Sequence, residues 1–119
     1  MTDRELLEAA ARAAGIAYDA RYITPENVMF QGLLLPTETR NTKPKWWNPL
    51  TDDGDALRLA VRLGLLVYVF HEPPMTCIRL PGEHVGGKYD KVELHAKDPY
   101  AATRRAIVRA AAQIGEGMA

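Results

Sequence analysis

Two adjacent tryptophans beside a group of cations are the residues in this chain best suited to recognise a ligand. Arg40, Lys43 and Lys45 precede Trp46 and Trp47 in a stretch without helix or strand periodicity. An indole can stack on a nucleotide base while a cation neutralises its phosphate. Tryptophan and arginine are also over-represented at the centres of protein interfaces. A third interpretation is structural, with one indole anchored in the core and hydrated cations around it, and all three stay open.

A second pair of cations could complete a nucleotide site. Arg105 and Arg109 lie one turn apart on a predicted helix near the C-terminus, where they could form a small basic patch for an anionic partner. A hydrated helix face explains the same spacing. The nucleotide interpretation is strengthened if these two arginines and Arg104 lie beside Trp46 and Trp47.

Residue types that support catalysis are sparse. The chain has no serine, a single cysteine (Cys77) and three histidines without metal-ligand spacing. The aspartates around Gly54 lack the spacing of a calcium loop and suit a helix start, where backbone amides stabilise carboxylates. We therefore predict a non-enzymatic protein with no metal and no cofactor.

Charge and hydropathy exclude two further classes of partner. Lysines and arginines number 15, as do aspartates and glutamates, so the formal net charge is zero and general binding to nucleic acid or a membrane surface is not expected. No secretory signal precedes the first predicted helix, and the longest apolar run, residues 63–70, is far shorter than the ~20 residues of a membrane span. These features predict a cytoplasmic protein.

Three segments carry helix start and stop signals. The first begins with a capping box at Thr2 and Glu5 and ends at Gly15. A second begins among residues 51–55 and ends at Gly64. The third begins with Asp98 as N-cap and Pro99 at the first helical position, and we expect Gly115 to end it.

Strand-like segments lie between the helices. Residues 18–23 and 28–35 flank a turn and predict a hairpin; residues 65–71, 75–80 and 89–95 follow. In the last of these, Val92 and Leu94 alternate with Lys91, Glu93 and His95, which predicts a strand with one wet, polar face. The almost continuously apolar 65–71 segment predicts a strand covered on both faces. The order α-β-β-α-β-β-β-α predicts an α+β fold in which a mixed, mainly antiparallel sheet of about five strands packs on three helices. We expect one domain over residues 1–119, with a mobile loop at 36–49.

Three stretches resemble small uncharacterised proteins of tailed bacteriophages and prophages, the phage ABA-sandwich family. They are WNPLTDDGDALRLAV at residues 47–61, DPYAATRRAIVRAAA at 98–112, and LLEAAARAAG at 6–15 followed by Tyr18 and Asp19. The resemblance covers about half of the chain. It implies a sheet between helices, Trp47 as a core residue and residues 48–55 as a helix-entry turn.

The resemblance also implies a function class. We expect a phage or prophage accessory protein in the bacterial cytoplasm that acts by binding, most simply by blocking a host defence or regulatory protein through the segment from Lys43 to Trp47. Sequestering a nucleotide-like small molecule with the same tryptophans and the C-terminal arginines is the alternative. A self-associating structural module, a homo-oligomer, is the second alternative.

Overall fold

The computed structural model describes residues 1–19, 30–36, 45–82 and 88–118. Its helices and strands follow the predicted α-β-β-α-β-β-β-α order, so the α+β class is confirmed. The elements are α1 (Asp3–Ala14), β1 (Leu33–Leu35), β2 (Lys45–Trp47), α2 (Asp53–Leu63), β3 (Leu66–His71), β4 (Pro74–Arg79), β5 (Lys91–Leu94) and α3 (Pro99–Glu116).

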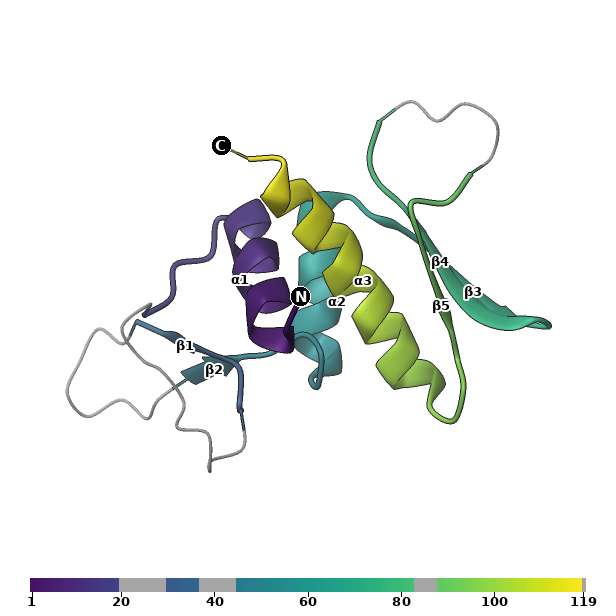
Figure 1. The fold of residues 1–119 in the computed structure, drawn as a ribbon, viewed down its shortest axis with the longest axis horizontal. Coiled ribbons are helices and arrows are strands. Elements are labelled where there is room, and N and C mark those ends of the chain that lie inside the picture. Colours follow the sequence, from purple (N-terminus) through teal and green to yellow (C-terminus); the bar gives the residue numbers. More distant parts are fainter. Residues whose placement is uncertain (20–29, 37–44, 83–87, 119) are drawn as a thin grey trace.

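The strands form two antiparallel sheets rather than one. β1 pairs with β2, whereas β3, β4 and β5 form a second sheet with β4 at its centre. The helices lie between the two sheets (Figure 1). The layer order therefore differs from the sheet between helices that the phage resemblance implies.

Helix ends follow the local signals in the sequence. The Thr2 hydroxyl accepts a hydrogen bond from the Glu5 amide at 3.1 Å, as the capping box predicts. Gly15 and Gly64 end α1 and α2 in the left-handed conformation, with φ of 69° and 65°. Asp98 caps the start of α3 by accepting from two backbone amides. The three predicted helices are thereby confirmed.

The predicted end of the third helix is wrong by two residues. α3 continues to Glu116, and Gly115 is buried inside it instead of ending it. A Cβ atom at Gly115 would collide with the backbone carbonyl oxygen of Ala9 in α1. The glycine therefore permits a close helix crossing, which is a long-range requirement that looks like a stop signal in the sequence.

Two predicted segments differ from the observed strands. The 18–35 hairpin is described only in part: Asp19 donates a backbone hydrogen bond to Leu34, but residues 20–29 lie outside the described residues. Within the predicted loop at 36–49, Lys45–Trp47 form β2, while residues 37–44 also lie outside the described parts. β2 therefore lies inside a segment that was predicted to be entirely loop, and it pairs with β1.

Replacing Gly115 by alanine tests the helix crossing. Gly115→Ala should lower the free energy of unfolding by about 1–3 kcal/mol, because the added methyl group forces α1 and α3 apart. Gly117→Ala is the matched control, since its nearest atom is 3.5 Å away and its φ of −76° suits alanine. Urea denaturation of both variants measures the difference. Equal midpoints for the two would contradict the crossing.

Candidate functional site

The two tryptophans of the predicted binding segment have different environments. Trp47 is 6% exposed and belongs to the hydrophobic core, as the phage resemblance implied. Trp46 is partly exposed and Lys45 is exposed on β2. Arg40 and Lys43 lie outside the described residues. Of the two indoles, only Trp46 therefore has surface to offer a partner.

Trp47 is fixed by the turn that follows it. The Asn48 amide donates to Asp55 Oδ2 at 3.0 Å, and the Asn48 side chain accepts from the Leu50 amide at 3.1 Å. Asn48 also accepts from the Asp52 amide through its backbone carbonyl. These bonds tie β2 to the first turn of α2 and hold Trp47 over the core.

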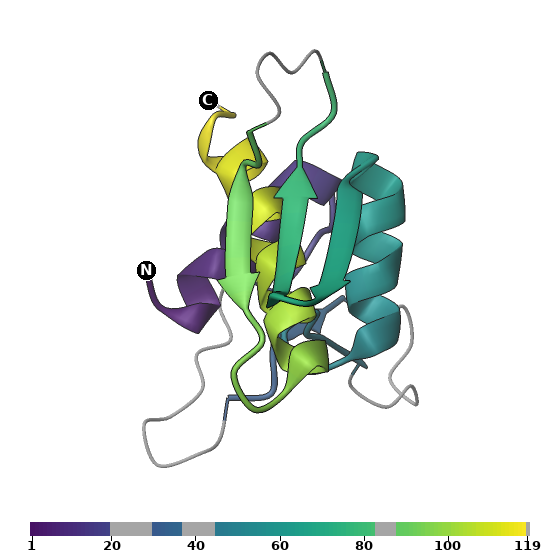
Figure 2. The same ribbon diagram turned by 90° about the vertical axis from the view of Figure 1, so that its right-hand side faces the viewer.

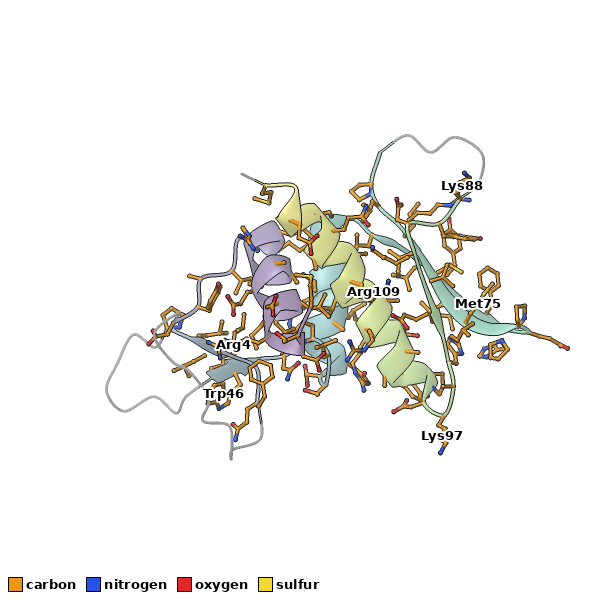
Figure 3. All side chains as sticks on the ribbon, viewed as in Figure 1. Arg4, Trp46, Met75, Lys88, Lys97 and Arg109 are labelled. Carbon is orange, nitrogen blue, oxygen red and sulfur yellow. The ribbon has the colours of Figure 1, made fainter. Side chains whose placement is uncertain are left out.

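The C-terminal arginines do not meet the tryptophans. Arg109 and Trp46 lie on different sides of α1 (Figure 3). Arg109 pairs with Glu93 at 2.6 Å, and Arg105 pairs with Asp3 at 3.1 Å. Each cation is thus matched by a carboxylate, so this face of α3 is not a bare basic patch.

A different surface, not identified from the sequence, surrounds β3. Residues Leu66 to Val69 are all exposed, although the sequence predicted a strand covered on both faces. β3 pairs with β4 along one edge, and no described strand pairs with its other edge. Figure 2 shows β3 at the border of the sheet, next to α2. The apolar run of residues 63–70 was the available signal, but it gave no information about exposure.

A groove lies between the open edge of β3 and the helices. It has a volume of about 390 Å³, and its walls come from α2, β3 and α3. Its apolar lining includes Ala56, Leu57, Ala60, Val67, Val69 and Ile107. Val67 and Val69, which line the groove, are 37% and 49% exposed. We call this the β3–α2 groove.

Polar groups lie among the same lining residues of the groove. Asp53, His71, Thr103 and Arg104 all line it. Arg104 has a structural role, because its Nη1 lies 2.6 Å from Asp53 Oδ1 and its Nε donates a hydrogen bond to the Leu50 carbonyl. The groove is therefore mainly an apolar surface with a few polar groups, which is typical of a binding site.

A buried polar chain links the groove to the centre of the sheet. Thr103 Oγ1 lies 2.7 Å from Thr76 Oγ1, which lies 2.8 Å from His95 Nε2. Thr76 is fully buried and His95 is 5% exposed. These bonds join β4 to α3 and satisfy polar groups that would be costly to bury alone.

The opposite face of the three-stranded sheet is also uncovered. Strand register places Leu66, Tyr68, Phe70, Met75, Cys77, Arg79, Val92 and Leu94 on it, and the Tyr89 ring packs against Tyr68 and Phe70. In Figure 2 this face points toward the viewer with no helix over it. We call it the open sheet face.

β5 shows that the apolar residues point outward. The sequence placed Val92 and Leu94 on one side and expected the Lys91, Glu93 and His95 side to be wet. In the structure Val92 and Leu94 are 44% and 71% exposed, whereas His95 is 5% exposed and hydrogen-bonded to Thr76 of β4. The alternation predicted correctly which residues share a face. The apolar face is the exposed one, however, and the face that carries His95 points toward the interior.

Comparison with known proteins identified no relative of this chain. No family model, no curated protein and no solved structure matches the chain. The phage resemblance accordingly stays a prediction. Within the described ranges, no three metal-binding side chains cluster, and no helix is long and apolar enough to cross a membrane.

The stability of tryptophan variants tests the placement of the two indoles. Trp47→Ala should cost about 3–5 kcal/mol of unfolding free energy, because it leaves a cavity in the core. Trp46→Ala should cost markedly less, because Trp46 is only partly buried. Thermal or urea denaturation of the two variants provides the comparison. A larger loss for Trp46→Ala would contradict the assignment.

The reactivity of Cys77 tests the packing under the open sheet face. Burial raises the pKa of the Cys77 thiol, so at neutral pH less of the reactive thiolate is present than in the unfolded chain. Alkylation by iodoacetamide should therefore be at least about tenfold slower in the folded protein than in urea. Mass spectrometry of quenched samples gives both rates. Equal rates would show that Cys77 is accessible.

Proposed function

We propose that this protein is a non-enzymatic accessory protein that acts by binding an extended strand of another protein in the β3–α2 groove. The observation that carries the proposal is the exposure of β3. The most apolar run of the chain is left uncovered beside an apolar groove. Large exposed apolar surfaces on a folded domain are typical of interaction sites.

The open edge of β3 supplies main-chain partners for such a strand. Edge strands normally carry charged residues, prolines or bulges that prevent pairing. Leu66–Phe70 contains no charge and no proline, and its register with β4 is regular. An added strand would therefore gain hydrogen bonds along one side without removing any from β4.

The groove supplies pockets for the side chains of the same strand. Side chains of a strand point alternately to its two faces, so every second residue of the incoming segment would enter the groove. There it would contact Ala60, Val67 and Val69, with exposed Leu57 of α2 beneath it. An extended segment with apolar residues at alternate positions is the chemistry that fits.

A second copy of this chain fits that edge poorly. α2 lies just beyond β3, beneath the position that an added strand would take (Figure 2). Two β3 strands paired about a twofold axis would place both α2 helices in the same region, although helices need 8–10 Å between their axes and strands only about 4.8 Å. A foreign strand without a helix beneath it avoids this collision.

The source of the partner follows from the phage resemblance. We propose that the partner is a bacterial host protein of defence or regulation, which this protein blocks by occupying one of its strands. The nucleotide alternative gains no support from the placement of Arg109 away from Trp46 (Figure 3). It remains a prediction from the sequence.

Selection from a random library of eight-residue peptides tests the proposal. Peptides retained by the wild-type protein should share apolar residues at alternate positions. Methylation of a peptide's backbone nitrogens should abolish binding at every second position and be tolerated in between, because only alternate amides face β3. Isothermal titration or fluorescence anisotropy measures each affinity. Insensitivity to N-methylation would overturn the strand-addition mode.

Two variants of the protein locate the binding surface. Val69→Glu places a charge in the groove and should weaken a selected peptide by about tenfold or more. Leu57→Glu, at a well-exposed helix position, should weaken it without risk to the fold. Val92→Glu is the matched control, because it introduces the same charge on the open sheet face. Loss of binding in the control alone would refute the groove.

A further inference from the structure

The open sheet face is a second apolar surface, separate from the β3–α2 groove. Its exposed members include Leu66, Tyr68, Val92 and Leu94, drawn from both edge strands of the sheet. An antiparallel sheet with one wet face should carry polar residues there. Here the polar residues of β5 turn inward and its apolar residues turn outward. The sheet thus has the composition of a layer that is covered on both sides.

We propose that a second copy of this chain covers the open sheet face, so that two copies pack sheet against sheet in a twofold dimer. The surface is suited to its own copy because it is apolar and carries almost no charge. Arg79 is the one charged residue that the register places on it, and its guanidinium lies over the Tyr68 and Tyr89 rings, 5.7 and 5.0 Å from their centroids. A twofold interface requires such self-complementarity.

The charges at the two ends of the face select one orientation. Arg79 pairs with Leu66 at one end of the β3–β4 hairpin, and Glu72 occupies the turn at the other end. A twofold axis perpendicular to the strands places each Arg79 toward the Glu72 end of the other copy. An axis parallel to the strands would instead bring the two Arg79 side chains to the same end. Charge complementarity therefore favours the perpendicular axis.

The size of the face is sufficient for a reversible dimer. Three strands about 4.8 Å apart, two of six residues and one of four, at about 3.3 Å per residue, give a face of roughly 15 Å by up to 20 Å. Two such faces, with their uneven side chains, bury on the order of 1,000 Å² in total, near the lower limit for a specific interface. We therefore expect a dissociation constant in the micromolar range, on the order of 1–100 μM.

Sedimentation equilibrium over about 1–500 μM protein tests the dimer. The mass should rise from 13.2 kDa toward twice that value as concentration increases. Val92→Glu puts a charge on the face, beside Cys77 of the central strand, and should weaken the dimer about a hundredfold or more. Leu94→Asp, at a position that is 71% exposed, is a second disrupting variant that leaves the core untouched. Circular dichroism checks that both variants fold.

Val61→Glu is the matched control, because Val61 is 73% exposed on α2, away from the open sheet face. It should dimerise like the wild type. A wild-type protein that stays at 13.2 kDa throughout would overturn the proposal. So would a dimer that survives both Val92→Glu and Leu94→Asp, or one that only Val61→Glu disrupts.

The orientation has its own test. Glu72→Lys should weaken the dimer several-fold, and added salt should reduce that difference, because the pairing with Arg79 is electrostatic. An unchanged dissociation constant would overturn the perpendicular axis. The dimer and the strand-binding groove are tested separately. Val92→Glu should weaken dimerisation and leave peptide binding unchanged, whereas Val69→Glu should weaken peptide binding. Neither result can be mistaken for the other.

Discussion

The close crossing of α1 and α3 determines where the other elements can lie. Gly115 of α3 lies against the Ala9 backbone, and both helices bury alanines along the contact. Small side chains let the two helix axes approach closely. α3 is then shared among α1, α2 and the strands β4 and β5. Because α3 packs on the sheet mainly through β4 and β5, β3 extends past the helix that supports the rest of its sheet.

α2 is held in a position that leaves β3 uncovered. Arg104 of α3 binds Asp53 at the start of α2 and the Leu50 carbonyl before it. These two bonds fix the N-terminal end of α2 beside α3 rather than beneath β3. The groove between β3 and α2 is therefore a consequence of how the helices are locked together.

The helices could be predicted from the sequence because their signals are local. A cap residue, an apolar stripe and a terminal glycine act within one or two turns, and Thr2, Gly15 and Gly64 behave as their types indicate. Gly115 shows the limit of such reasoning. Its role depends on Ala9, more than 100 positions earlier, and no local pattern distinguishes a helix stop from a helix crossing.

The strands and the candidate site depended on information that a single sequence lacks. Alternation in β5 predicted which residues share a face, but the burial of His95 depends on its hydrogen bond to Thr76 of β4, which in turn bonds to Thr103 of α3. Trp46 and Trp47 are adjacent and chemically identical, yet only Trp47 reaches the core. Residue type identified the apolar and aromatic segments of the chain. Only the packing identified which of them remain uncovered.

The two proposed surfaces are compatible in one assembly because they use different parts of β3. Sheet-on-sheet packing covers the outward side chains of a strand and leaves its backbone edge free, whereas strand addition uses that edge and the inward side chains Val67 and Val69. A dimer would then present two grooves. If both engaged neighbouring strands of one partner assembly, the second binding event would be intramolecular, so the apparent affinity would exceed that of either groove alone. Weak self-association would in this way strengthen a weak peptide site.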